Sequence, residues 1–344
     1  MVKAMKKEIE IRVVNWPYPK LETIYFGGGT PSILTPALLA SLFETIHLHF
    51  DVSQIEEITL EANPDDISRE NILAWMSLGI NRLSIGLQST QNKRLGWMNR
   101  IHTAEQGRSS VLLAQELGIE NISLDLMYNF QGSSNEELLA DIQSLVSLSP
   151  NHISAYGLTI EPKTVFAQMV SKGKLMPMPD DEAASQYVIV TETLLAHGFD
   201  QYEISSFCKP GFQAVHNSNY WFQKPYLAIG PGAHGFDEMV RTENLPNNAG
   251  YIKSINENNA LFQKEEILSM KDIANEMIIT RLRTKWGISN KDLLEKTRLN
   301  LLQVRRKELK KFSELNHIII KNETVFLTLA GKLLADGIAM ELMF

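Results

Sequence analysis

The sequence has little cysteine and no long hydrophobic run. Its 344 residues include one cysteine, Cys208, so no internal disulfide can form and a reducing cytosol is the expected compartment. A lone thiolate also cannot hold an iron–sulfur cluster, which usually needs several. No apolar run approaches the roughly 18 residues of a membrane span, and the N-terminal stretch MVKAMKKEIEIRVV lacks the apolar centre of a signal peptide. We therefore expect a cytoplasmic protein.

Basic residues are outnumbered by acidic ones. The chain has 33 lysines and arginines against 40 aspartates and glutamates, a formal net charge of -7. This argues against a nucleic-acid partner, which favours a basic surface. A basic run near the C-terminus lies among acidic residues and is expected to be a solvated helix face. It comprises Arg305, Arg306, Lys307, Lys310 and Lys311.

The first half of the chain alternates short apolar segments with helical patterns. Strands are predicted at Leu21–Phe26, Glu57–Ala62, Arg82–Leu87, Ile122–Met127 and His152–Leu158. Helices are predicted between them, over residues 36–50, 68–79, 103–118 and 134–149. Thr35 before Pro36 is a common helix start, and Ser134 with Glu137 has capping-box spacing. Such alternation predicts parallel strands with right-handed crossovers, in either a doubly wound sheet or a barrel.

The second half has a looser pattern. DDEAASQYVIVTETLLAHGF predicts a long helix that ends at Gly198, and QYEISSF predicts one further strand. From about Leu268 the sequence predicts three helices, a short hairpin and a last helix. This order suggests a small winged-helix-like appendage.

Polar residues recur where the predicted strands end, which is where ligands bind in parallel α/β proteins. Glu61, Gln88 and Asp125 have side chains suited to hydroxyls, amines or amides, and the fifth strand carries Tyr156. Each residue alone has an ordinary structural explanation, as a cap or a loop acceptor. Their recurrence at one end of successive strands favours a ligand site.

The first strand ends in the glycine-rich stretch FGGGTPS. It lacks the lysine and Ser/Thr of a P-loop, and its spacing differs from the dinucleotide-binding fingerprint. Three successive glycines are costly to order. We expect their backbone to line a small polar ligand; the alternative is a bend packed against a helix.

A second cluster lies in AVHNSNYWF. His216 and Tyr220 are four residues apart, so a helix would place them on one face. The stretch predicts either an ordinary amphipathic turn or a planar ligand stacked on aromatic rings and ligated by imidazole. The nearby YLAIGPGAHGF contains His234 in a glycine-rich loop that is expected to press against a ligand or another backbone.

Taken together, these stretches resemble a known family. TIYFGGGTPS, ITLEANP, RLSIGLQS, LGWMNRIH, NISLDLMY, HISAYGLTIEPKTVF, QYEISSF, HNSNYW and YLAIGPGAHG are similar, in order, to motifs of HemW-type radical S-adenosylmethionine (SAM) proteins. These are heme chaperones related to the oxygen-independent coproporphyrinogen III oxidases. The resemblance covers essentially the whole chain.

The resemblance implies a fold and a function. The expected fold is α/β: a partial (β/α)6 radical-SAM-type barrel over residues 1–160, an accessory α+β region over 161–265, and a winged-helix-like helical domain over 266–344. The implied function is heme binding and delivery to apoproteins, including membrane-associated respiratory proteins. The alternative is a radical SAM enzyme of porphyrin biosynthesis, like the oxidases. A homodimer is compatible with either function.

The resemblance also assigns site residues. The implied SAM contacts are Gly27, Gly28, Gly29, Thr30, Pro31, Glu61, Gln88, Arg100 and Asp125. Arg100 suits the SAM carboxylate because a guanidinium matches a carboxylate fork. The HNxxYW motif, associated with heme, matches His216, Asn217, Tyr220 and Trp221. His216 is the implied ligand of heme iron.

One family feature is missing from the sequence. The family begins with a strand and a CxxxCxxC loop whose thiolates hold a [4Fe-4S] cluster, and this chain contains neither. Met1 is expected to fall within the helix after that loop, through a start site placed too far downstream or a truncated gene; the alternative is a cluster-less relative. The chain as written is therefore expected not to cleave SAM.

Overall fold

The computed structural model describes residues 1–344. It contains two compact units. The first unit comprises residues 1–59, 77–80 and 214–344, and the second unit comprises residues 60–76 and 81–213. Strand β2 (Glu57–Ala62) contributes residues to both units.

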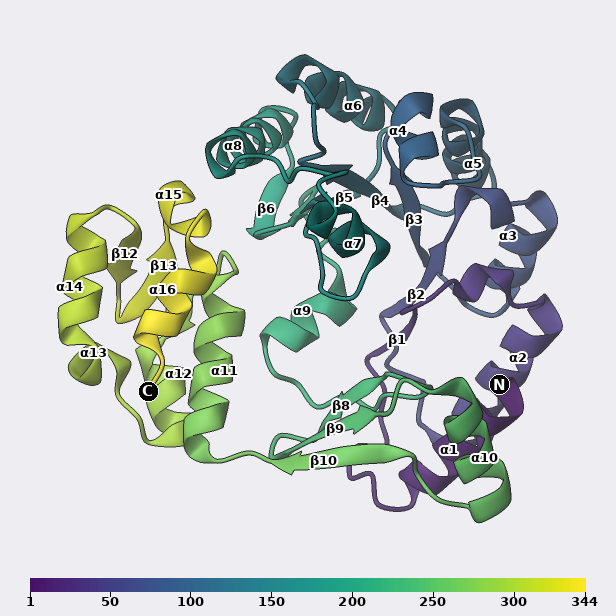
Figure 1. Ribbon diagram of the computed structural model, residues 1–344. Coiled ribbons are helices and arrows are strands. Elements are labelled where there is room, and N and C mark those ends of the chain that lie inside the picture. Colours follow the sequence, from purple (N-terminus) through teal and green to yellow (C-terminus); the bar gives the residue numbers. More distant parts are fainter. The chain divides into compact units, whose positions relative to one another are not determined.

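The second unit is a parallel sheet with helical crossovers. Its strands β3 (Arg82–Gln88), β4 (Asn121–Tyr128) and β5 (His152–Gly157) pair in parallel. Its helices are η2 (Pro64–Asp66), α3 (Arg69–Ser77), α4 (Asn92–Trp97), α5 (Ala104–Glu116), α6 (Asn135–Ser147), α7 (Val165–Ser171) and α8 (Asp180–Ala196). Figure 1 shows α4, α5, α6 and α8 lying together along one side of β3–β5.

The strand order decides between the two predicted architectures. The sheet runs β1-β2-β3-β4-β5-β7-β6, with β1 at Thr23–Phe26. The first five strands are neighbours in sequence order, whereas a doubly wound sheet reverses its order at a switch point. The partial barrel is therefore the architecture of this chain, and the five predicted strands are confirmed within one or two residues.

The predicted strand over QYEISSF was wrong in one respect. It forms two antiparallel strands, β6 (Asp200–Glu203) and β7 (Ser206–Cys208), and β7 also pairs antiparallel with β5. The Glu203 carboxylate accepts hydrogen bonds from the backbone N–H of Ser205 (3.0 Å) and the hydroxyl of Ser206 (3.1 Å). These bonds close a tight turn that breaks the single strand into a hairpin.

The helix caps explain why several elements begin where they do. The Thr35 side chain accepts from the backbone of Leu38 ahead of α2, and Thr103 and Ser134 make capping boxes at α5 and α6. Each side-chain oxygen satisfies a backbone N–H that has no partner within the helix.

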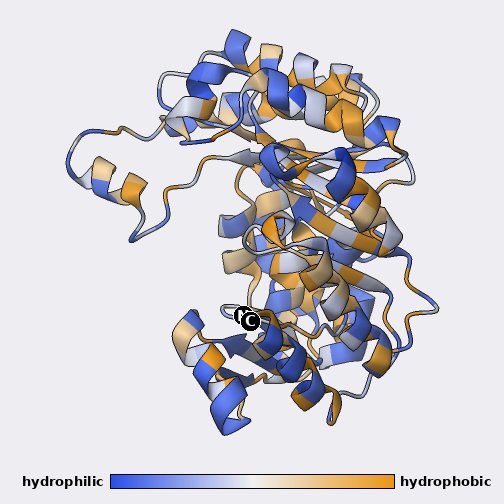
Figure 2. Cartoon of the chain, turned by 90° about the vertical axis from the view of Figure 1, so that its right-hand side faces the viewer, coloured by the Kyte–Doolittle hydropathy of each residue, from blue (hydrophilic) through white to orange (hydrophobic).

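Along the helices, hydrophilic and hydrophobic residues alternate (Figure 2), which is typical of helices with one buried face.

The first unit joins the N-terminal helices to the accessory sheet. Its elements before residue 268 are α1 (Val2–Val13), η1 (Pro31–Ile33), α2 (Pro36–His49), α9 (Val215–Trp221), β8 (His234–Phe236), β9 (Val240–Asn244), α10 (Asn248–Asn258) and β10 (Gln263–Ile267). Strands β10, β9 and β8 form an antiparallel sheet. A small core of Ala4, Tyr251 and Ile255, all fully buried, joins α1 to α10.

The C-terminal part of the first unit has the predicted winged-helix order. Its elements are α11 (Met270–Leu282), β11 (Ile288–Ser289), α12 (Asn290–Thr297), α13 (Leu301–Val304), α14 (Arg306–Glu314), β12 (Ile318–Lys321), β13 (Thr324–Leu327), α15 (Leu329–Lys332) and α16 (Ala335–Leu342). The third predicted helix is interrupted at Arg305, and the last one is split into α15 and α16. On α14, Lys310 and Lys311 are exposed and lie near Glu314 and Glu341, as predicted for a solvated face.

Candidate functional site

The glycine stretch follows directly on β1. Residues 27–30 are exposed, and Gly28 has a φ of +77°, a conformation that side-chain-bearing residues rarely adopt. A Cβ added at Gly28 or Gly29 would meet no atom within 4 Å. No neighbouring atom therefore fills the side-chain position of Gly28 or Gly29, which favours the ligand interpretation over a bend packed against a helix.

Acidic residues gather on β2 and β4 in the second unit. Asp125 lies within β4, where burial and, to a smaller extent, the nearby Glu61 carboxylate raise the pKa of its carboxyl to about 7. Arg82 and the hydroxyls of Ser84 and Ser154 act in the opposite direction, and the Ser84 hydroxyl donates to Asp125 at 3.4 Å. The pair therefore favours a positively charged or hydroxyl-bearing partner, which would relieve the repulsion between the two carboxyls.

A set of uncharged and cationic groups converges over Gly86 in the same unit. A Cβ added at Gly86 would lie 3.2 Å from Gln88 Nε2, 3.8 Å from Asn63 Oδ1 and 3.9 Å from Arg100 Nη1. Arg100 donates to Asn63 at 3.2 Å. Burial lowers the pKa of Arg100, and Asp125 and Asp65 oppose that shift. Gln88 has a φ of +68°, a conformation that is uncommon away from turns and functional sites.

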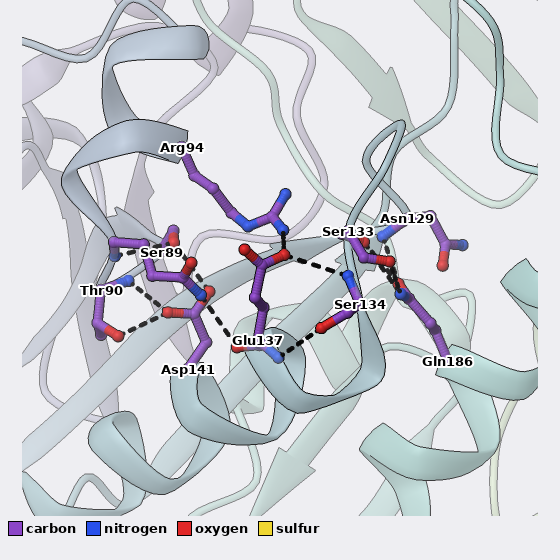
Figure 3. A network of polar contacts seen from close by, with 10 residues as sticks. Ser89, Thr90, Arg94, Asn129, Ser133, Ser134, Glu137, Asp141 and Gln186 are labelled. Atoms are coloured by element: carbon purple, nitrogen blue, oxygen red, sulfur yellow. Dashed lines mark hydrogen bonds and ion pairs between the residues drawn. The ribbon is translucent and has the colours of Figure 1, made fainter.

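Two polar networks fix the loops that leave this end of the strands (Figure 3). Asp141 of α6 accepts from the Ser89 hydroxyl (2.8 Å) and from the backbone N–H (2.9 Å) and hydroxyl (2.6 Å) of Thr90. Gln186 of α8 accepts from the Asn129 backbone N–H at 3.0 Å. The two loops directly follow β3 and β4, so the networks hold the C-terminal ends of the strands that carry Gln88 and Asp125.

The predicted heme cluster forms a short helix, α9, in the first unit. The carboxylate of Glu57, on β2, accepts from the backbone N–H groups of Val215 (2.8 Å) and His216 (3.1 Å) and from the Thr59 hydroxyl (3.2 Å). Glu57 is 3% exposed. A buried carboxylate therefore anchors the first turn of the helix and suits the positive end of its dipole.

The imidazole of His216 is held on three sides. Its Nδ1 lies 2.7 Å from the Thr23 hydroxyl, and its Nε2 lies 2.7 Å from the Tyr220 hydroxyl. Its ring stacks on Tyr25 with centroids 4.9 Å apart and an interplanar angle of 23°. The four-residue spacing thus correctly predicted that His216 and Tyr220 share one helix face. Thr23, Tyr25 and Glu57 carried no sequence signal, because their contact with α9 is long-range.

The next residue of the HNxxYW motif has an unused donor. The indole N–H of Trp221 is buried and has no hydrogen-bond partner, and the same holds for the hydroxyl of Ser218 one turn earlier. Buried donors without partners are rare in proteins. Heme presents an iron ion and carboxylates. His216 supplies a nitrogen ligand for the iron, and Trp221 and Ser218 supply hydrogen-bond donors for a carboxylate. The residues on α9 therefore fit heme.

The residues present do not fit an iron–sulfur cluster. Cys208, the single cysteine, is buried in β7, and residues 1–344 hold no group of three potential metal ligands. The predicted SAM contacts are found in both units: Gly27–Pro31 in the first, and Glu61, Gln88, Arg100 and Asp125 in the second.

The comparisons with known proteins are consistent across the chain. Residues 5–145 match the Radical SAM superfamily and residues 268–334 match the HemN C-terminal domain. The heme chaperone HemW of Bacillus subtilis is 35% identical over 336 residues, which cover 97% of this chain and 89% of the relative. The chain belongs to the HemW heme chaperone family.

A further relative supports this membership, and a solved structure shows the fold. The HemW protein of Haemophilus influenzae is 35% identical over 91% of this chain and 81% of its own length. The solved structure of the coproporphyrinogen III oxidase HemN from Escherichia coli matches with a TM-score of 0.82 over 99% of this chain and 82% of that chain, at 20% identity. This second likeness shows the fold alone.

No helix of residues 1–344 has both the length and the apolar character needed to cross a membrane.

Proposed function

We propose that this protein binds heme on α9 and delivers it to apoproteins. The observation that carries the proposal is the environment of His216. The residue lies on α9 with Nδ1 against Thr23 and its ring stacked on Tyr25, so the imidazole is oriented before any ligand arrives. A histidine oriented through its other nitrogen is the usual arrangement at protein metal sites. The name "heme chaperone" borne by the HemW relatives agrees with this role.

Titration of the purified protein with hemin tests the proposal. We expect a saturable shift of the Soret band, and we expect His216→Ala to remove most of the affinity because the iron loses its protein ligand. His234→Ala is the matched control: His234 is an exposed histidine of the same unit and its replacement should leave the titration unchanged. Equal hemin binding by His216→Ala and the unmodified protein would reject His216 as the ligand.

The same proposal includes SAM binding through residues of each unit. Its residues are Gly27–Pro31 of the first unit and Glu61, Gln88, Arg100 and Asp125 of the second, with Arg100 for the carboxylate of SAM and Asp125 for an amine or a ribose hydroxyl. The support is the space beside Gly28 and Gly29 and the convergence of Arg100 and Gln88 over Gly86. When bound to a cluster, SAM supplies radical chemistry in this superfamily; the residues here only hold it.

The pKa of Asp125 makes the SAM assignment testable. Because that pKa is raised to about 7, the carboxyl is protonated below pH 7 and becomes a charged acceptor above it. The affinity for SAM, measured by calorimetry, should rise about ten-fold as the pH increases from 6 to 8, the scale of a charge-assisted hydrogen bond. Asp125→Asn should abolish this rise. A pH-independent affinity in the unmodified protein would contradict the assignment.

A further inference from the structure

The nitrogen of His216 that faces away from the sheet is covered. Its Nε2 lies 2.7 Å from the hydroxyl of Tyr220, which belongs to the next turn of the same helix. A phenol keeps its proton at neutral pH, so the Tyr220 hydroxyl can donate it to Nε2 as a hydrogen bond.

The two hydrogen bonds of the imidazole differ in how easily they can open. Thr23 lies on strand β1, so its contact with Nδ1 at 2.7 Å is fixed by the sheet. Tyr220 is 36% exposed and its ring packs edge-on against Tyr226 with centroids 4.6 Å apart. A rotation of the Tyr220 side chain uncovers Nε2, whereas uncovering Nδ1 would require moving a strand.

We propose that the Tyr220 hydroxyl masks Nε2, the nitrogen of His216 that binds iron. Thr23 occupies Nδ1 and so leaves Nε2 as the nitrogen available to iron. The inference rests on the proposed heme function and adds a regulatory contact to it. In the masked state Nδ1–H donates to the Thr23 hydroxyl and the Nε2 lone pair accepts from the Tyr220 hydroxyl. In the open state the Tyr220 hydroxyl leaves and the same lone pair binds iron, so no proton has to be transferred.

Such a mask suits a carrier that must release its cargo. Every heme that leaves exposes Nε2, and the Tyr220 hydroxyl can then replace iron as its partner. The hydrogen bond lowers the affinity for heme by the free energy needed to break it, because a site that must open first binds more weakly. Tyr220 therefore favours release without removing the ligand.

Tyr220→Phe is the direct test, by hemin titration and stopped-flow release of hemin to an excess of apomyoglobin. The ring stays and the hydroxyl is lost, so we expect about five-fold tighter binding and correspondingly slower release, the scale of one net hydrogen bond. Tyr226→Phe is the matched control. It removes a hydroxyl from the neighbouring ring, but that hydroxyl lies 3.3 Å from Arg241 rather than at His216, so hemin affinity should not change.

Replacement of Thr23 tests the choice of nitrogen. Thr23→Val keeps the shape and loses the hydroxyl; we expect weaker hemin binding and an altered Soret position, because Nδ1 is no longer held. Thr23→Ser retains the hydroxyl and should restore both values. An effect on folding alone would leave the Soret position of bound heme unchanged, so the spectrum separates positioning from stability.

Each alternative outcome has a distinct signature. If the unmodified protein shows no Soret shift, or if His216→Ala binds hemin as tightly as the unmodified protein, His216 is not the ligand. The proposed mask is then rejected as well. If His216→Ala loses hemin but Tyr220→Phe binds and releases it like the unmodified protein, only the mask is wrong. If Tyr220→Phe loses hemin together with a phenolate-to-iron charge-transfer band, Tyr220 is itself the ligand. Unchanged binding by Thr23→Val would overturn the role of Thr23.

Discussion

Glu8→Ala is expected to lower the free energy of unfolding by about 3–5 kcal/mol, the cost of leaving a buried charge without its partner. Glu8 on α1 is completely buried. Its carboxylate pairs with Arg12 at 2.7 Å and accepts from the Gly230 backbone N–H (2.8 Å), Asn244 (2.8 Å) and the Tyr251 hydroxyl (2.5 Å). Alanine would leave four donors of the first unit without this acceptor.

A second ion pair provides the control for this prediction. Arg69 and Glu116 lie 2.6 Å apart, but their side chains are 58% and 64% exposed. Exposed pairs contribute little because water screens the attraction, so Glu116→Ala should hardly shift the urea midpoint. If Glu8→Ala and Glu116→Ala shifted the midpoint equally, burial would not be what makes the Glu8 network important.

The Glu8 network shows where sequence-based prediction stops. The four-residue spacing of Glu8 and Arg12 is typical of a pair on one helix face, but the charged N-terminal segment gives no sign that this face is buried. Its partners Gly230, Asn244 and Tyr251 are more than 220 residues away. The burial of these charges is set by long-range packing between α1 and the accessory sheet, which periodicity does not encode.

Local features were predicted more successfully. The caps at Thr35 and Ser134 and the five strands depend on neighbouring residues, and the structure confirms them. The break between Glu203 and Ser206 was missed because the alternating polar and apolar residues of QYEISSF also predict one continuous strand. For α9, spacing placed His216 beside Tyr220, whereas Glu57 and Thr23 could be found only once the fold had brought β1 and β2 to the helix.

The anchoring of α9 by Glu57 gives the second large effect. Glu57→Ala should lower the free energy of unfolding by about 3 kcal/mol, because the backbone N–H groups of Val215 and His216 lose a charged acceptor, and hydrogen bonds to charged groups are worth about 1.5–3 kcal/mol each. The same change should weaken hemin binding, because the first turn of α9 fixes the direction of the His216 side chain. Urea unfolding and hemin titration measure the two effects.

Two further variants separate the carboxylate from its surroundings. Glu57→Gln keeps one oxygen acceptor, so its losses of stability and hemin affinity should be intermediate. Glu56→Ala removes the adjacent glutamate, which is exposed, and should change neither quantity appreciably. Glu57→Ala with normal hemin affinity would mean that Thr23 and Tyr25 hold the imidazole without the helix anchor. If both stability and hemin affinity fall in Glu57→Ala, and fall by an intermediate amount in Glu57→Gln, the buried carboxylate on β2 both stabilises the fold and positions the iron ligand.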